Sequence, residues 1–258
     1  MSLTLATYPD LRDKHVLITG GAGGIGEAIT TAFAGQGSRV TVLDRDAKQG
    51  EALATQLNAS GTLVDFQAVD VTDESKLLAT LKHAEQSHGP VDVLINNAGH
   101  DPRHDMMEMT TQQWDDIFRL NVTHYFWTCR ALIPAMKERK RGSIIMTSSV
   151  NAWSGDLHLA CYTATKAAIL GLMKSLAREV GPFNIRVNAV APGWVMTQRQ
   201  LRDLVSPEDK RKLIEEWQLL PQLLEPKHLA PTYLFLASEA SSMITRQCIL
   251  VDAGIAMA

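Results

Sequence analysis

The sequence has few cysteines, no long apolar run and no excess of either charge. Three cysteines occur in 258 residues, an odd number at no metal-ligand spacing, which argues against a disulfide framework or a structural zinc site. No apolar run is long enough to span a bilayer, and the first residues lack a secretory signal. With 25 basic against 28 acidic residues, the net charge of −3 argues against a dedicated nucleic-acid binder. We expect a cytoplasmic globular protein that binds neither nucleic acid nor membrane.

From residue 14 onward, short β-rich apolar runs alternate with longer segments of helical period. Seven strands interleaved with helices predict an α/β fold: a Rossmann-type, doubly wound parallel sheet with helices on both faces. The predicted strands are Lys14–Thr19, Arg39–Leu43, Leu63–Val69, Val91–Ile95, Ser143–Thr147, Ile185–Val190 and Gln247–Val251. The predicted helices are Glu27–Gln36, Asp46–Asn58, Asp73–Ser87, Thr110–Lys137, Cys161–Val180 and Pro226–Ala237.

One predicted domain covers residues 1–258, and one stretch interrupts its rhythm. Residues 194–220, hereafter the insert, are polar, helix-prone and unaccompanied by a strand. The insert follows the sixth strand, so it should lie at the carboxyl edge of the sheet, where ligands bind in such folds. We therefore expect it to form a substrate lid.

A glycine-rich turn, Gly20–Gly26, joins the first strand to the first helix. Glycines let a backbone approach a pyrophosphate, and a helix N-terminus offers free N–H groups and a positive dipole. Asp44 follows the turn at roughly the 20-residue spacing of the acid that binds the adenosine ribose. Its carboxylate would repel a 2′-phosphate and favours NAD, whereas the Arg45 guanidinium could accommodate the phosphate of NADP. The alternative is a structural turn beside a surface carboxylate.

Tyr162 and Lys166 form an i,i+4 pair on one helix face, and Ser149 follows the fifth strand. A tyrosine works as acid or base near neutral pH only if its pKa falls from about 10, and a neighbouring ammonium favours the phenolate. Such pairs are otherwise mere surface neighbours. Ser149 could equally be a strand cap, and Asn121 a mid-helix polar residue bonded to backbone.

Together these features resemble the short-chain dehydrogenase/reductase family, in its branch of short single-domain enzymes. The resemblance covers nearly the whole chain. It rests on the Thr19–Gly26 turn, Asp70-Val71, Asn96-Asn97-Ala98-Gly99, Asn121, Ser149, Tyr162-x-x-x-Lys166 and Pro192-Gly193-x-x-x-Thr197. Departures from the family pattern are slight: Thr165 stands where serine is commoner, and Asp252-Ala253-Gly254 replaces a commoner Asp-Gly-Gly.

The resemblance implies four catalytic roles. Tyr162 is the general acid/base, and Lys166 lowers its pKa and binds the nicotinamide ribose. Ser149 orients the reacting oxygen, and Asn121 holds a water that links Lys166 to solvent. The implied cofactor contacts are Gly20, Gly24, Ile25, Gly26, Asp44, Asp70, Val71, Asn97, Ala98, Gly99, Tyr162, Lys166, Pro192, Gly193, Val195 and Thr197. The family also implies a homotetramer, paired through Thr110–Lys137 and Cys161–Val180 and through the C-terminal strand and helix; the apolar run Ile249–Ala258 fits burial against a partner.

Polar loops at the predicted cleft mouth indicate a hydroxyl-rich substrate. The pattern of an Arg-His loop at residues 100–105 and a GWVxTxRQ segment resembles bacterial aldose 1-dehydrogenases, which oxidise xylose, galactose or fucose at the anomeric carbon to a lactone. The hypothetical substrate residues are Arg103, His104, Ser149, Trp153, Tyr162, Trp194, Gln198 and Gln200. The loop could instead be solvated surface, and the two tryptophans could be core or interface residues. Pro102 prevents the helical spacing that would align His100 with His104 on a metal, so we expect no metal site.

The sequence therefore predicts an NAD-dependent dehydrogenase that oxidises an aldose at C1, with NADP not excluded. The alternative within the family is a carbonyl reductase acting on a 3-oxoacyl thioester or a small diketone. Asp44 and the polar loop disfavour that alternative. A catalytically inactive nucleotide-binding sensor is disfavoured because Ser149, Tyr162 and Lys166 are all present.

Overall fold

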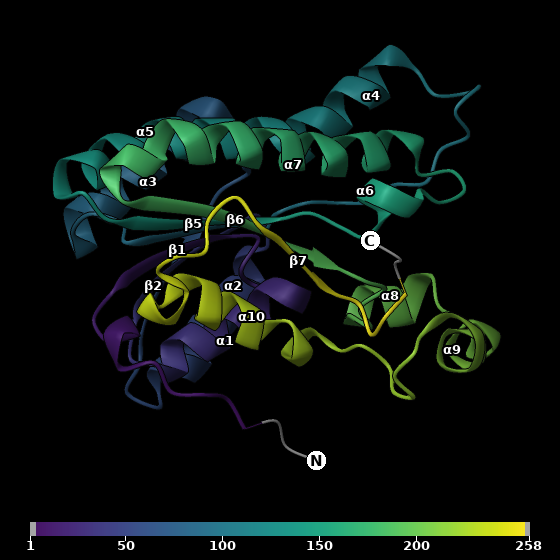
Figure 1. Cartoon of the computed structure of the whole chain (residues 1–258), viewed down its shortest axis with the longest axis horizontal. Helices are drawn as coiled ribbons and strands as arrows, with labels where there is room; N and C mark the ends of the chain where they lie inside the picture. The colour runs from purple at the N-terminus through teal and green to yellow at the C-terminus, as the bar shows by residue number, and fades with distance from the viewer. Residues whose placement is uncertain (1–3, 256–258) are drawn as a thin grey trace.

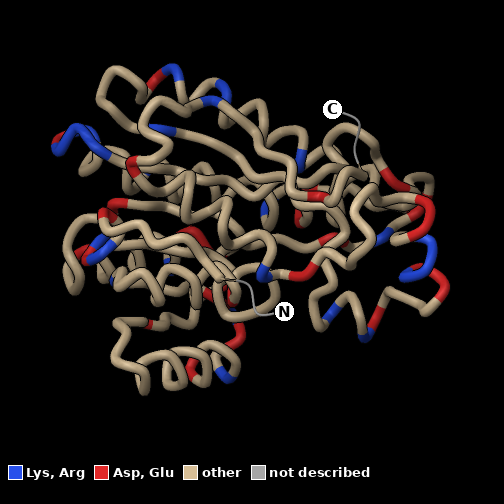
Figure 2. The backbone as a smooth tube through the Cα atoms, turned by 60° about the horizontal axis from the view of Figure 1, so that its bottom comes forward, with Lys and Arg blue, Asp and Glu red and all other residues tan. Residues whose placement is uncertain are grey.

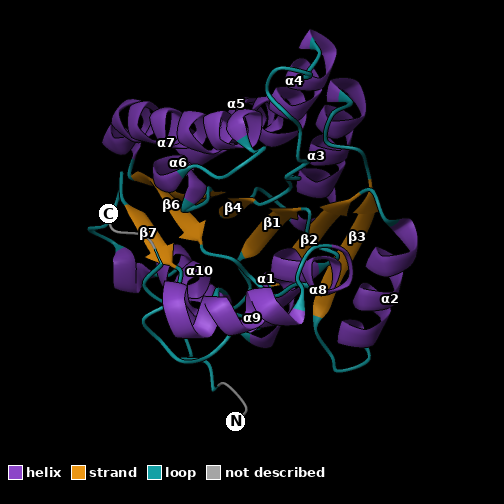
Figure 3. Ribbon diagram, turned by 90° about the vertical axis from the view of Figure 1, so that its right-hand side faces the viewer, coloured by secondary structure: helices purple, strands orange, loops and turns teal. Residues whose placement is uncertain are grey.

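The computed structural model describes residues 4–255 and is built around a seven-stranded, fully parallel sheet (Figures 1 and 3). The strand order is β3-β2-β1-β4-β5-β6-β7. The strands are β1 (His15–Thr19), β2 (Arg39–Asp44), β3 (Leu63–Ala68), β4 (Val93–Asn96), β5 (Gly142–Thr147), β6 (Ile185–Pro192) and β7 (Cys248–Val251). Every residue of β1 and β4 is buried, as expected for central strands covered on both faces. The predicted doubly wound fold is confirmed.

Helices cover the two faces of the sheet as separate layers (Figure 1). On one face, the apolar core includes Leu81, Tyr125 and Met173 from three of the helices that cover it. On the other face, the core includes Phe33 and Tyr233 from two further helices. The α-helices are α1 (Gly24–Gly35), α2 (Ala47–Asn58), α3 (Glu74–His88), α4 (Thr111–Phe118), α5 (His124–Arg139), α6 (Asn151–Ser154), α7 (Ala160–Val180), α8 (Gln198–Asp203), α9 (Pro207–Lys212) and α10 (Ala230–Ala237).

The predicted helix Thr110–Lys137 is interrupted in the structure. A π-helical turn, Arg119–Thr123, separates α4 from α5 and carries Asn121. Such turns insert an extra residue into a helix and occur often at functional sites. The amphipathic pattern continues through the turn, so periodicity alone could not reveal it.

The insert is helical and carries no strand, as its sequence predicts, whereas the helix after it starts later than predicted. Within the insert the chain forms α8, α9 and a π-helical turn, Leu213–Trp217. Arg211 holds this segment together through ion pairs with Glu208 at 2.8 Å and Glu215 at 2.6 Å. The predicted helix Pro226–Ala237 begins as a 3₁₀ turn, and α10 starts only at Ala230.

Acidic and basic residues are interspersed over the backbone (Figure 2). No helix within residues 4–255 is long and apolar enough to cross a membrane. Of the apolar C-terminal run Ile249–Ala258, residues 256–258 lie outside the described part of the chain.

Candidate active site

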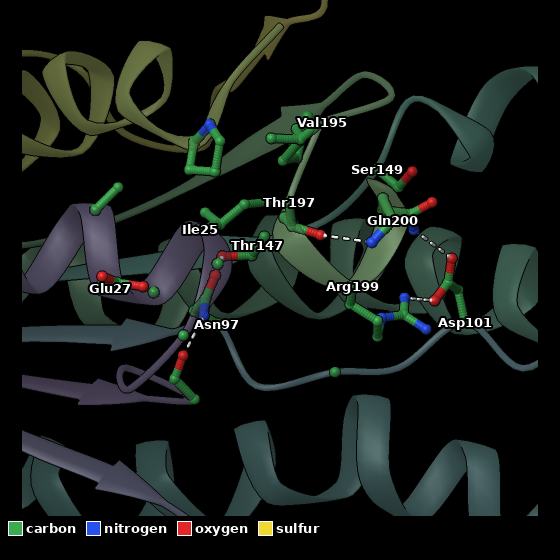
Figure 4. A pocket seen from close by; sticks show the side chains of 18 of the residues that line it. Ile25, Glu27, Asn97, Asp101, Thr147, Ser149, Val195, Thr197, Arg199 and Gln200 are labelled. Carbon is green, nitrogen blue, oxygen red and sulfur yellow. Dashed lines mark hydrogen bonds and ion pairs between the residues drawn. The ribbon is translucent and has the colours of Figure 1, made fainter. Parts of the chain in front are cut away.

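A cavity of about 1800 Å³ opens at the carboxyl edge of the sheet. It is bordered by the turn after β1, the ends of β2 and β4, the loops after β5 and β6, and α7. Figure 4 shows part of the lining, including Asn97 after β4, Ser149 after β5 and Thr197 after β6. In a parallel sheet these strand ends meet at the point where strand order reverses, the usual ligand crevice. All the predicted cofactor residues line this cavity: Gly20, Gly24, Ile25, Gly26, Asp44, Asp70, Val71, Asn97, Ala98, Gly99, Tyr162, Lys166, Pro192, Gly193, Val195 and Thr197.

The glycine turn leaves no room for a side chain at Gly20 or at Gly26. Gly20 has a φ of +64°, and a Cβ there would lie 2.7 Å from the Cα of Ala98. A Cβ on Gly26 would lie 1.8 Å from the carbonyl oxygen of Gly20. The Asn97 side-chain amide donates to that same carbonyl at 2.9 Å, which ties the turn to the end of β4. The tight turn and the helix N-terminus behind it fit a dinucleotide pyrophosphate.

Asp44 ends β2 beside this turn and faces the cavity. Its carboxylate accepts hydrogen bonds from the backbone N–H groups of Ala22 and Asp46, both at 3.1 Å. These bonds fix the carboxylate at the place predicted for the ribose-binding acid. Arg45 also lines the cavity, but its side chain is exposed.

Tyr162 and Lys166 both project from α7 into the cavity, next to Ser149. The Lys166 ammonium lies 5.5 Å from the centroid of the Tyr162 ring and donates to the Thr147 carbonyl at 2.9 Å. Burial lowers the pKa of Lys166 to about 8. Its charge is therefore costly, and this ammonium needs partners.

Burial raises the pKa of the Tyr162 phenol, and the negative charge of Asp101 raises it further. A hydrogen bond with Ser149 and the positive charge of Arg199 act in the opposite direction. The Lys166 ammonium lies 5.5 Å from the centroid of the same ring, and a positive charge at that distance favours the phenolate.

Asn121 is fully buried and does not line the cavity. Its side-chain oxygen accepts from the His100 N–H and its amide donates to the His100 carbonyl, both at 2.9 Å. The π-helical turn thus clamps the peptide that follows Gly99. A Cβ on Gly99 would lie 3.1 Å from the Asn121 side-chain oxygen and 3.4 Å from Lys166 Nζ, so the glycine allows this close packing.

The cavity brings together six of the eight predicted substrate residues: Arg103, Ser149, Tyr162, Trp194, Gln198 and Gln200. His104 and Trp153 are not among its lining residues. The Trp153 side chain is 44% exposed, and the His104 N–H donates to the His158 carbonyl at 2.9 Å. The sequence placed both near the cleft but could not show that Trp153, within the short helix α6, is absent from the cavity lining while its helix neighbours Asn151 and Ser154 are part of it.

A polar network joins the loop after β4 to the insert, and the sequence did not pair its members. Asp101 forms an ion pair with Arg199 and accepts a hydrogen bond from the Gln200 amide at 3.3 Å (Figure 4). The Trp194 indole donates to Gln200 at 2.9 Å, and its ring stacks on Trp217 at 6.2 Å. The only sequence signal was that both segments are unusually polar for a cleft mouth.

A model of the family described as short chain dehydrogenase matches residues 14–204. The chain belongs to the short-chain dehydrogenase family. It is therefore an oxidoreductase that acts on CH–OH groups or the corresponding carbonyls and uses a nicotinamide cofactor. The resemblance inferred from the motifs is confirmed.

Among its relatives, the short-chain dehydrogenase is 38% identical to a probable galactose dehydrogenase, GalD, of Rhizobium meliloti (strain 1021), over 99% of this chain and 100% of the relative. It is 36% identical to a D-xylose 1-dehydrogenase of Caulobacter vibrioides, over 98% of this chain and 99% of the relative. Its structure matches that of a 3-oxoacyl-[acyl-carrier protein] reductase with bound NAD from Brucella melitensis. That match has a TM-score of 0.89 at 35% identity and covers 100% of this chain and 99% of the other.

Proposed function

We propose that this enzyme oxidises an aldose at C1 to its lactone and passes the hydride to NAD. The observation that carries the proposal is the polar network beside Tyr162, in which Asp101, Arg199 and Gln200 line the cavity with Trp194. Sugars bind through hydroxyl groups and present C–H faces that pack against aromatic rings, so carboxylate, guanidinium, amide and indole groups suit them. The names of the galactose and xylose dehydrogenase relatives support the same substrate class.

Tyr162 removes the proton of the anomeric hydroxyl as that carbon is oxidised. The Ser149 hydroxyl, which acts to lower the pKa of the Tyr162 phenol, holds the reacting oxygen beside that phenol. Positioned general-base catalysis of this kind contributes about 10²- to 10⁴-fold to a rate. The bound nicotinamide supplies the hydride acceptor.

Lys166 holds the ribose next to the nicotinamide, because a buried ammonium with one protein acceptor has donors left for ribose hydroxyls. Asn121 positions the loop after β4 and holds a water that connects Lys166 to solvent. The positioning role is supported by the pair of bonds to the His100 peptide, which directly follows Gly99 beside Lys166.

Asp44 selects NAD over NADP. Its carboxylate is held by two backbone N–H groups in the cavity wall, where it can accept hydrogen bonds from ribose hydroxyls and repel a 2′-phosphate. The neighbouring Arg45 guanidinium can accommodate that phosphate, so we expect NADP to bind, but more weakly than NAD.

The enzyme acts in the cytoplasm as a single-domain homotetramer whose insert closes over the substrate. Light scattering that found a monomer at micromolar concentration would contradict the tetramer.

The test is the absorbance of reduced nicotinamide on mixing the protein with an aldose and either NAD or NADP. Galactose, xylose, fucose and rhamnose form the panel, and the lactone is identified as product. We expect turnover of at least one aldose, and a faster rate with NAD than with NADP.

The second candidate function is reduction of a 3-oxoacyl thioester, which the Brucella melitensis protein of similar structure is named for. Turnover of acetoacetyl thioesters with no aldose oxidised would establish that activity instead.

A further inference from the structure

Asp101 places a carboxylate beside the catalytic tyrosine, outside the set of catalytic residues. It lines the cavity, and its side chain is only 17% exposed. Its negative charge acts on both Tyr162 and Lys166 and raises the pKa of each. Burying a carboxylate costs free energy unless hydrogen-bond donors surround it. The donors around Asp101 therefore indicate the role of its carboxylate.

Two residues of α8 hold this carboxylate in place. Arg199 pairs with one carboxylate oxygen, Oδ1, and the Gln200 amide donates to the other, Oδ2, at 3.3 Å (Figure 4). The direction of the Gln200 amide is fixed by Trp194. An indole N–H can only donate, so it selects the amide oxygen and leaves the amide nitrogen to face Asp101. Stacking on Trp217 in turn orients the Trp194 ring.

The carboxylate keeps acceptor capacity after these bonds are made. Two carboxylate oxygens offer about four acceptor positions, and the guanidinium and the amide use two of them. His100 Nδ1 lies 3.7 Å away, beyond an ordinary hydrogen bond, and burial lowers the pKa of that imidazole, which keeps it neutral at pH 7. Because Asp101 lines the cavity, a substrate hydroxyl can donate a hydrogen bond to the remaining acceptor positions of its carboxylate.

We propose that Asp101 determines substrate specificity by accepting a hydrogen bond from a hydroxyl group of the aldose other than the one that is oxidised. Arg199 and Gln200 are positioning residues that hold the carboxylate for this bond. The inference rests on the proposed aldose oxidation and adds to it the group that distinguishes a polyhydroxylated substrate from a simple hemiacetal. A site built to bind a hydroxyl discriminates strongly against an analogue that lacks it.

The experiment compares wild type, Asp101→Asn and a matched control, Asp203→Asn. Asp203 lies on α8 and pairs with Arg202 at 2.6 Å, but it does not line the cavity. Three kinds of probe are used: the best aldose of the panel, its monodeoxy analogues, each lacking one of the hydroxyl groups other than the anomeric one, and tetrahydropyran-2-ol, which carries the anomeric hydroxyl alone. NAD affinity and Tm are measured for each variant, so that a folding defect is recognised.

For Asp101→Asn we expect kcat/KM on the parent aldose to fall roughly tenfold to hundredfold, mainly through KM, because a charged acceptor is lost. With wild type, at least one deoxy analogue should show the same fall in kcat/KM relative to the parent aldose. Asp101→Asn should oxidise that analogue and the parent aldose with equal kcat/KM. On tetrahydropyran-2-ol, which has no second hydroxyl for Asp101 to bind, the two enzymes should differ far less than on the parent aldose, and any remaining difference reports the charge of Asp101 acting on Tyr162 and Lys166. Asp203→Asn should match wild type throughout.

Two results would overturn the inference, and they are distinguishable. If wild type oxidises aldoses but Asp101→Asn lowers kcat/KM by the same factor on every probe, the residue has only a structural or general electrostatic role and the proposed function survives. If wild type oxidises no aldose, the proposed function and this inference both fail.

Discussion

Lys166 is a buried ammonium, and burying its charge lowers the stability of the folded chain although the residue is needed for activity. Burial lowers its pKa from 10.5 to about 8, and within residues 4–255 the ammonium donates to one acceptor, the Thr147 carbonyl. That carbonyl also accepts from the Tyr125 hydroxyl at 3.1 Å. When the chain folds without cofactor, the Lys166 ammonium is buried with less solvation than water would give it. This is expected for a group that is completed by a bound ligand.

Replacing Lys166 by Met should stabilise the cofactor-free protein at pH 7 by about 1–3 kcal/mol and remove activity. Because the folded pKa lies below the unfolded one, the unfolded chain binds more protons between about pH 8 and 10.5. The stability of wild type thus rises with pH across that window, and the penalty is fully present below it. Tm measured at pH 7 and pH 9.5 should show the advantage of the variant shrinking at the higher pH. A variant less stable than wild type at both values would contradict this account of Lys166.

Replacing Tyr162 by Phe should leave NAD affinity nearly unchanged and lower kcat about a hundredfold to ten-thousandfold, since the ring stays and the acid/base hydroxyl goes. Cofactor titration by tryptophan fluorescence separates the two effects. Retention of most of the activity would mean that another group carries the proton.

At the scale of elements, the strands were predictable and the turns that shape the site were not. β1 and β4 read as apolar runs because they are buried on both faces, so their sequence alone indicates parallel strands. The π-helical turn around Asn121 has no such signature, because its stabilising partner is the peptide of His100, far from it in sequence. The same holds for Arg199, whose partner Asp101 lies 98 residues away.

The glycine turn offers a direct test at this scale. Gly26→Ala forces a Cβ to within 1.8 Å of the Gly20 carbonyl, so we expect a loss of about 1–3 kcal/mol in stability and a roughly tenfold or greater loss of NAD affinity. Gly35→Ala, at the other end of α1, meets no atom within 4 Å and should stabilise the helix by up to about 1 kcal/mol. Thermal melts and NAD titration measure both. Equal behaviour of the two variants would show that the turn is not the tight pyrophosphate cradle described above.

For the whole molecule, the cavity has one side that the family motifs assign and one side that they do not. The first consists of the glycine turn, the end of β4, Ser149 and α7, and its residues could be assigned from spacing. The second joins the loop after β4 to the insert, where the sequence indicated polar substrate residues but not which of them pair. Trp153 and His104 illustrate the limit: both were expected in the pocket, and neither lines it.

The most direct test of the central claim follows the hydrogen on C1. An aldose of the panel carrying deuterium at C1 is incubated with the protein and NAD, and the reduced nicotinamide and the sugar product are analysed by mass spectrometry and NMR. Oxidation at the anomeric carbon predicts reduced nicotinamide that carries the deuterium and a lactone that has lost it. Reduced cofactor without the label, or no reduction with any aldose while a 3-oxoacyl thioester is reduced, would contradict the proposal.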